Sequence, residues 1–165
     1  MSSKIYNKPY TVLRDKQEKV DYWDFPETSF CKGTVWQSMK TGDYTLEGME
    51  NIFTIERKGS TGEFAQNITE ARFSRELVRL DQMPQAYLIL EFTWDDIETF
   101  PHNSGIPSKF WPNLRVSSKF IRKRLIEIMS DYNVQVILAG SRGPEIAQAI
   151  FRRMSEVYGE KEFTG

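Results

Sequence analysis

Three ionisable residues, Asp43, Glu56 and Lys58, have the types and the spacing that catalysis uses. The mainly apolar stretch 52–58 has the two-residue period of a β-strand, which places Glu56 and Lys58 on one face together with Thr54. A carboxylate and an ammonium on one strand face point toward the same place. The alternative is a strand that emerges into solvent with a charged end.

The two acids are placed to meet across a hairpin. Twelve residues separate Asp43 from Glu56, so adjacent strands can bring the two carboxylates side by side. Clustered carboxylates repel each other unless a cation neutralises them, and hard oxygen ligands select Mg²⁺ or Mn²⁺. Such a metal stabilises charge on a phosphoryl group and lowers the pKa of bound water, while Lys58 would orient that water or support charge in the transition state. The pattern suits metal-assisted hydrolysis of a phosphodiester.

Composition narrows the class of protein. The chain has 165 residues, and 22 Lys and Arg against 23 Asp and Glu leave a net charge of −1, so any nucleic-acid surface must be a local cluster. One cysteine, Cys31, and one histidine, His102, argue against an internal disulfide or a Cys/His zinc site. Without an apolar run of membrane-spanning length or a signal core, we expect a soluble intracellular protein of the cytoplasm, nucleoid or nucleus, with no membrane partner.

The elements needed to position these residues form an α/β pattern. Strand signals begin the chain and suggest an antiparallel meander, over 10–13, 34–39, 43–49 and 52–58. A helix capped by Ser60 or Thr61 follows. Two buried strands are then expected over 86–92 and 134–140, and further helices over 94–100, over 118–131 and from Pro144 onward. Residues 101–115 are expected to form a long ordered loop or lid. The prediction is one domain over 1–165, with its core at about 10–158, a mixed sheet and helices on both faces.

The order of four short motifs resembles the XPF-type structure-specific endonuclease domain, within the PD-(D/E)XK nuclease superfamily. The motifs are Asp15-x-x-Glu18 after a strand, an aromatic Phe-Pro loop, Gly42-Asp43-Tyr44, and Ile55-Glu56-Arg57-Lys58. A helix bearing Arg72 and an apolar run ending at Glu91 also fall where that family has them. The resemblance covers roughly residues 10–155 and implies a restriction-endonuclease-like fold, with the meander followed by parallel strands.

The resemblance implies a DNA endonuclease dependent on Mg²⁺ (or Mn²⁺), acting on branched, flap or junction DNA in repair or recombination. The implied catalytic residues are Asp43, Glu56 and Lys58; the implied metal ligands are Asp15, Asp43 and Glu56; and the implied supporting residues are Glu18, Arg57 and Glu63. Relatives commonly pair two nuclease-like subunits, so a homodimer or a partner subunit is expected. No helix-hairpin-helix module is expected in this chain.

Two positions depart from the family pattern. Gln17 stands where the first motif has an arginine, which removes a cation. Gly62 stands where the family has an acid after the lysine, so either Glu63 substitutes from the first helical turn or that position is dispensable.

Basic residues on two predicted helices are candidates for DNA binding. One set is Arg72, Arg75 and Arg79, and the other is Lys119, Arg122 and Lys123. Each has an alternative as a solvated helix face, supported for the first set by a potential Arg72–Glu76 pair. The four tryptophans are interpreted as core or lid packing rather than as base-stacking platforms.

Two further functions stay open from the sequence. One is a non-catalytic nuclease-like subunit that binds DNA or a partner, although the presence of all three catalytic residue types argues against it. The other is a nuclease that acts on DNA ends or linear duplex.

Overall fold

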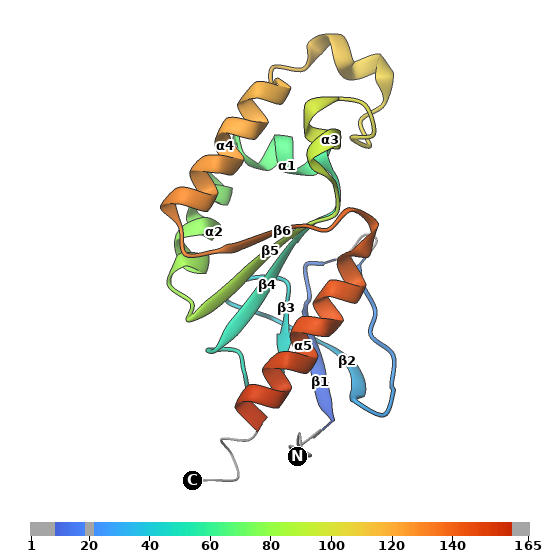
Figure 1. Ribbon diagram of the computed structural model, residues 1–165, viewed down its shortest axis with the longest axis vertical. Coiled ribbons are helices and arrows are strands. Elements are labelled where there is room, and N and C mark those ends of the chain that lie inside the picture. Colours follow the sequence, from blue (N-terminus) through green and yellow to red (C-terminus); the bar gives the residue numbers. More distant parts are fainter. Residues whose placement is uncertain (1–8, 19–21, 160–165) are drawn as a thin grey trace, which may run out of the picture.

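The strands of this chain assemble into one mixed sheet, in the order β2-β1-β3-β4-β5-β6 (Figure 1). The computed structural model describes residues 9–18 and 22–159. The strands are β1 (Tyr10–Asp15), β2 (Cys31–Gln37), β3 (Tyr44–Leu46), β4 (Phe53–Lys58), β5 (Gln85–Leu90) and β6 (Gln135–Leu138). Antiparallel pairing joins β1 to β3 and β3 to β4, and parallel pairing continues from β4 through β5 to β6. The predicted mixed sheet is therefore confirmed.

One detail of the predicted meander is wrong, because β2 pairs parallel with β1 at the edge of the sheet. A meander needs a short turn between consecutive strands, whereas a segment with buried Trp23 and Phe25 precedes β2. That segment leads the chain back to the start of β1, where the Tyr10 N–H donates to the Phe30 carbonyl at 2.9 Å. The other side of β1 is thereby left for β3.

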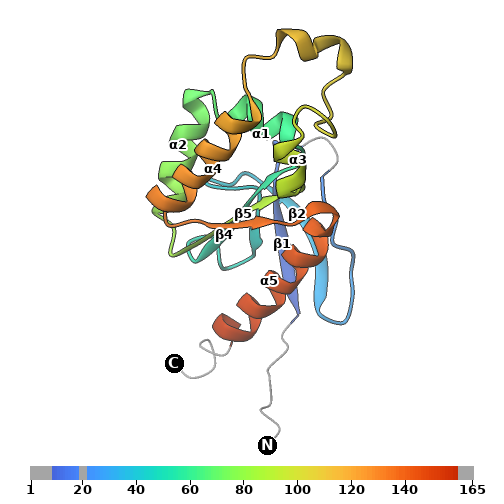
Figure 2. The ribbon, with the colours of Figure 1, turned by 45° about the horizontal axis from the view of Figure 1, so that its top comes forward.

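Helices cover both faces of the sheet, as predicted (Figures 1 and 2). One face carries α1 (Thr61–Asn67), α2 (Ala71–Asp81), α3 (Trp94–Glu98) and α4 (Ser118–Asp131), and the other carries α5 (Gly143–Gly159). Short 3₁₀ turns occupy Ser108–Asn113 and Gly140–Arg142. The Ser60 side chain caps α1, accepting from the Glu63 N–H at 3.1 Å. In the described part of the chain, no helix has the length and apolar character needed to cross a bilayer.

The period of β4 separates the apolar cores from the polar site. Phe53 and Ile55 point toward α5, where Phe53 lies 6.2 Å from Phe151 between ring centroids. The alternate residues Glu56 and Lys58 are buried on the face that α1 and α2 cover. A strand that is apolar on one face and charged on the other thus carries ionisable groups into the interior of the molecule.

Candidate active site

The β3–β4 hairpin places the Asp43 and Glu56 carboxyl groups next to each other. Tyr44 pairs with Ile55 in this ladder, and the Asp43 N–H donates to the Ile55 carbonyl at 2.8 Å. Oδ2 of Asp43 accepts the Arg57 N–H at 2.8 Å, which fixes the carboxylate against β4. The predicted approach of the two acids across one hairpin is therefore what the backbone register produces.

Gly42 permits this arrangement. Its φ of +78° lies in the left-handed region, and an added Cβ would lie 2.0 Å from Oγ1 of Thr54. That hydroxyl donates to the Thr41 carbonyl at 2.8 Å, so it has little freedom to move away. The tight contact seats the start of β3 directly on β4 and brings Asp43 to Glu56.

Lys58 completes the group from the far end of β4. Its side chain is buried, and its Nζ lies 3.9 Å from Oε2 of Glu76 on α2 and 5.0 Å from the centroid of the Phe73 ring. Glu76 therefore pairs with Lys58, and no Arg72–Glu76 ion pair exists within the described residues. Sequence reasoning missed Glu76 because α2's periodicity does not reveal which strand it covers.

These groups line a cavity of about 460 Å³ between the strand ends and α2. The acids that line it are Asp15, Glu18, Asp43, Glu56, Glu63 and Glu76, and the cations are Lys16, Lys40, Arg57, Lys58, Arg72 and Arg79. Both oxygens of Asp15 accept backbone hydrogen bonds, from Met39 at 2.9 Å and from Gln17 at 3.3 Å. Asp15 thus lies in the cavity wall while it holds together the turn after β1 and the segment after β2.

The crowding of acids favours protonated carboxyl groups. Burial, reinforced by the charge of Asp43, raises the pKa of Glu56 well above its ordinary value, and burial raises the pKa of Asp43 as well. Burial and the charge of Asp43 also raise the pKa of Glu18 to about 7. Burial alone would lower the pKa of Lys58, but the charges of Glu56, Glu76 and Asp43 outweigh it and raise that pKa. Lys58 therefore stays an ammonium.

A small divalent cation fits this donor set. Buried carboxylate oxygens without a hydrogen-bond partner face the group, namely Oε2 of Glu56, of Glu18 and of Glu76. Within the described residues, no set of three or more Asp, Glu, His or Cys side chains is arranged to hold a metal. The predicted ligands Asp15, Asp43 and Glu56 are therefore not seen as such a group among the described residues. Mg²⁺ is commonly bound through one or two carboxylates, with water and substrate phosphate completing the shell, so Asp43 and Glu56 are the side chains that could hold it.

Arg57 braces the opposite face of β4, as its place in the strand predicts. Its Nε forms a short charged hydrogen bond to Oε1 of Glu91, and its Nη1 lies 3.9 Å from Oε2 of Glu18. The guanidinium also lies 5.1 Å from the centroid of the Trp23 ring, whose Nε1 donates to the same Glu91 oxygen at 3.2 Å. Arg57 therefore ties the acidic turn after β1 to the end of β5, which Glu91 follows.

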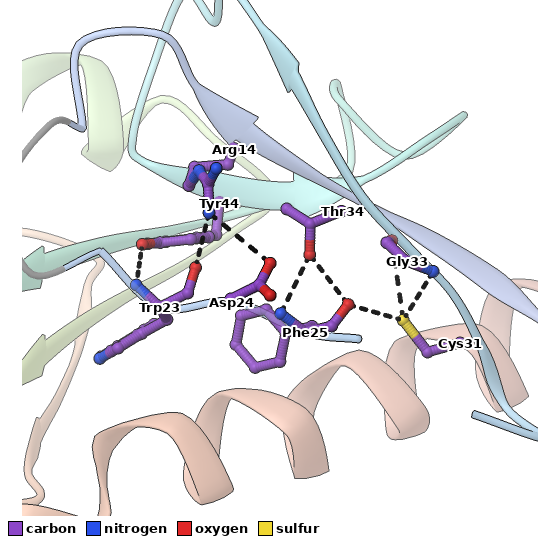
Figure 3. Close-up of polar contacts among 8 residues, drawn as sticks. All are labelled: Arg14, Trp23, Asp24, Phe25, Cys31, Gly33, Thr34 and Tyr44. Atoms are coloured by element: carbon purple, nitrogen blue, oxygen red, sulfur yellow. Dashed lines mark hydrogen bonds and ion pairs between the residues drawn. The ribbon is translucent and has the colours of Figure 1, made fainter. Parts of the chain in front are cut away.

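Tyr44 anchors the loop before β2 beside this brace (Figure 3). Its hydroxyl accepts the Trp23 N–H at 2.9 Å, and the two rings stack with centroids 5.0 Å apart. The same loop is held to β2 by the Thr34 hydroxyl, which accepts the Phe25 N–H and donates to the Phe25 carbonyl, both at 3.0 Å. The Gly-Asp-Tyr motif thus supplies a close approach of the backbone to Thr54, an acid in the cavity wall and a buried aromatic anchor.

The two departures from the family pattern have structural consequences. An added Cβ at Gly62 would lie 2.5 Å from the Ser104 carbonyl, so an acid does not fit there without rearrangement. Glu63 faces the cavity instead, although its Oε2 accepts the Gly59 N–H at 3.1 Å. Gln17 lines the exposed rim of the cavity, where a longer basic side chain would meet solvent.

The candidate DNA-binding residues separate into two groups. Arg72 and Arg79 are exposed and line the cavity on either side of Glu76, whereas Arg75 does not belong to its wall as the structure describes it. On α4, Arg122 binds both oxygens of Glu98 at 2.5 and 2.7 Å, which neutralises it. Among the described residues that line the cavity, none comes from α4. Lys119 and Lys123 therefore lie on a separate exposed surface.

The chain is similar in sequence pattern to one known family and in fold to solved structures. The sequence pattern of the ERCC4 domain matches residues 15–144 of the chain. XPF from Aeropyrum pernix in complex with DNA is 16% identical, with a TM-score of 0.56, over 88% of this chain and 64% of that one. The structure of XPF from Aeropyrum pernix without DNA is 17% identical, with a TM-score of 0.58, over 90% of this chain and 68% of that one. No curated protein matches the chain in sequence.

Proposed function

This chain belongs to the ERCC4 domain family, and on that premise we propose that it is a divalent-metal-dependent DNA endonuclease that hydrolyses phosphodiester bonds. The observation that carries the proposal is the group formed by the half-buried Asp43 and the buried Glu56 and Lys58, which faces a cavity lined with arginines. Burial raises the pKa values of three acids of this cavity, and for Glu18 and Glu56 the charge of Asp43 adds to the effect. A bound metal would offset both effects, which supports a metal-binding role for the cluster.

Asp43 and Glu56 would hold Mg²⁺ or Mn²⁺, which supplies charge neutralisation at the phosphate and acidifies bound water. Asp15 would support this group from the wall of the cavity, through the backbone contacts that its carboxylate makes. Glu18 and Glu63 would add negative potential at the rim of the cavity. They would also hold the chain segments that form this rim, Glu18 through Arg57 and Glu63 through the Gly59 N–H. These side chains place the scissile phosphate at the carboxyl end of β4.

Lys58 would act as a fixed cation beside the attacked phosphate. Because the surrounding carboxylates keep its ammonium charged, it is unsuited to accept a proton as a general base. A buried ammonium instead donates hydrogen bonds, which orient the attacking water and stabilise the negative charge that develops on the phosphate oxygens. Glu76 keeps the ammonium pointed into the cavity.

Arg72 and Arg79 would bind the DNA backbone at the mouth of the cavity. Both are exposed, and neither has an ion-pair partner among the described residues, so their charge is available to phosphates. The proposed substrate is branched, flap or junction DNA, in line with the family. A second copy of the chain or a partner subunit would increase the affinity for this DNA. The chain spans about two thirds of the length of the A. pernix XPF chains, of which one structure is a complex with DNA.

Labelled fork, flap, junction and linear DNA, incubated with Mg²⁺ or with EDTA, tests the proposal. We expect Mg²⁺-dependent internal cleavage of the branched substrates, and a loss of at least a hundredfold in Asp43→Asn and in Lys58→Ala. Glu127→Gln, on α4 and outside the cavity wall, is the matched control and should cut normally.

Each other outcome identifies an alternative. DNA binding without cleavage of any substrate would assign the chain to non-catalytic nuclease-like subunits. Cleavage confined to the ends of linear duplex would assign it to end-processing nucleases. Undiminished cleavage by Asp43→Asn would overturn the catalytic site.

A further inference from the structure

An arginine lies buried beneath two exposed aromatic rings at the edge of the sheet. Arg14 is 4% exposed, and its guanidinium carbon lies 3.8 Å from the centroid of the Tyr22 ring and 4.6 Å from that of Trp36. Its Nη1 donates to the Trp23 carbonyl at 3.0 Å and lies 3.9 Å from Oδ1 of Asp24 (Figure 3). Its Nε has no hydrogen-bond partner among the residues that the structure describes. The cation is therefore held by the Trp23 carbonyl, by Asp24 and by the two rings above it.

The two rings are exposed to solvent. Tyr22 is 40% exposed and Trp36 is 49% exposed, and their centroids lie 5.8 Å apart in an edge-to-face arrangement. The core ring of Trp23, by contrast, is 5% exposed. The sequence-based interpretation of all four tryptophans as packing residues therefore does not hold for Trp36. Its indole is fixed in place by Arg14 while much of its surface remains uncovered.

This ring pair lies close to the proposed active site along the chain. Arg14 pairs with Trp36 and Asp15 pairs with Gln37 in the parallel ladder, so the buried arginine and the cavity acid are consecutive residues of β1 and point to opposite faces of the sheet. From the cavity, the rings are therefore reached around the edge that β2 forms. Met39, whose N–H donates to Asp15, comes three residues after Trp36. Three residues of extended chain span about 10 Å. That span equals about three stacked nucleotides of one DNA strand.

We propose that Tyr22 and Trp36, backed by Arg14, form a stacking site for a base of single-stranded DNA that leaves the cavity around the β2 edge. The assignment of DNA as ligand rests on the proposed function. Every base has a π-face, so the site would bind single strands without sequence preference, and would select substrates with an unpaired arm. Lys16 and Lys40, both exposed in the cavity wall, lie on the path and would attract the backbone.

A nucleic acid fits this surface better than an apolar protein partner does. The rings cover a buried guanidinium, which adds positive potential to faces that would be neutral in an ordinary hydrophobic patch. An anionic strand gains from that potential, whereas an apolar partner has no charge that responds to it. Lys40, four residues after Trp36, is exposed in the wall of the cavity.

The test is binding in EDTA, so that cleavage does not enter the measurement. Fluorescence anisotropy compares a flap with a single-stranded arm against a blunt duplex of equal length, for the wild type, Trp36→Ala, Trp36→Phe and Tyr22→Ala. We expect the two alanine variants to bind the flap about tenfold more weakly and the duplex unchanged, because one stacked base contributes about that factor. Trp36→Phe keeps a ring and should stay within about threefold of the wild type.

The matched control is Trp94→Ala, which removes another exposed tryptophan, 38% exposed on α3 and outside this site. It should bind both substrates as the wild type does. Circular dichroism melting checks that each variant is folded, because both target rings contact the buried Arg14. Quenching of tryptophan fluorescence by an unlabelled single strand, lost in Trp36→Ala, gives a second readout.

The outcomes separate this inference from the nuclease assignment. A wild type that binds the flap through Trp36 yet cuts nothing with Mg²⁺ supports the stacking site and rejects the nuclease. Equal flap affinity of Trp36→Ala and the wild type overturns the stacking site, whatever the nuclease assay gives. A change of oligomeric mass in Trp36→Ala with unaltered DNA affinity also overturns it, and would assign the rings to a protein interface.

Discussion

The ammonium of Lys58 lies 3.9 Å from Oε2 of Glu76, an oxygen that accepts no hydrogen bond among the described residues. The two residues belong to β4 and α2, so this contact joins the strand that bears the proposed catalytic groups to the helix that bears Arg72 and Arg79. Because the ammonium is buried, its direction depends on which carboxylates surround it. Glu76 is therefore a positioning residue for Lys58.

Glu76→Gln should reduce the rate of Mg²⁺-dependent cleavage by about tenfold, since the ammonium would turn toward Glu56 and away from the phosphate. The affinity for DNA, measured in EDTA, should change by less than about twofold. Single-turnover kinetics on a flap substrate checks the rate, with Glu127→Gln as the control. A rate equal to that of the wild type would remove Glu76 from the machinery.

Addition of metal should stabilise the protein through Asp43 and Glu56. At a Mn²⁺ concentration about 100 times its Kd, binding to the folded state contributes about 2.7 kcal/mol, which raises the Tm of a chain of this size by about 5–10 °C. Calorimetry with Mn²⁺ and with EDTA measures the shift. Asp43→Asn/Glu56→Gln should show no shift, and a full shift in this variant would place the metal elsewhere.

In EDTA, stability should fall as pH rises from 5 to 8. The pKa of Glu18 is about 7 in the folded protein against an ordinary 4.5, so folding takes up a proton between these values. Its contribution to stability is complete below about pH 4.5 and is lost as the pH rises through 7, and the raised pKa values of Asp43 and Glu56 act in the same direction. Urea unfolding at several pH values measures this slope.

Glu18→Gln should flatten that pH dependence, because the amide does not titrate. Glu47→Gln, at an exposed position outside the cavity wall, is the control and should keep the slope of the wild type. A slope that is identical in Glu18→Gln would assign the effect to other groups.

The arginines of α2 should differ in their contribution to DNA binding. Arg79→Ala removes a cation from the wall of the cavity and should weaken binding about threefold to tenfold, with the salt slope reduced by about one. Arg75→Ala removes the same charge from the same helix outside that wall and should have the smaller effect. Equal losses in the two variants would indicate a diffuse helix face rather than the cavity mouth.

Two glycines with similar backbone angles should respond differently to alanine. Gly42→Ala combines a strained φ with a Cβ 2.0 Å from Oγ1 of Thr54, and should cost about 3 kcal/mol or more of unfolding free energy. Gly48, at φ +85°, has no atom within 4 Å of an added Cβ, so Gly48→Ala should cost only about 1 kcal/mol. Chemical denaturation compares them, and similar losses would show that Thr54 moves aside.

Local rules in the sequence predicted much of this protein. The two-residue period placed Glu56 and Lys58 on one face of β4, and the length of the hairpin placed Asp43 opposite Glu56, as the register shows. The predicted limits of α4, 118–131, match the structure, in which the Ser117 side chain caps the helix. Such features depend on residues near one another in the chain, whose preferences are readable in order.

Tertiary structure alone decided the parallel placement of β2, the pairing of Lys58 with Glu76, and the exposure of Trp36 above Arg14. The helical period of α2 says which side faces inward, but it does not say which strand lies beneath. Burial of Trp23 and exposure of Trp36 follow from where the loop before β2 packs, and each tryptophan has the same local preferences. Contacts between distant segments depend on the free energy of the whole packed chain, which no local pattern encodes.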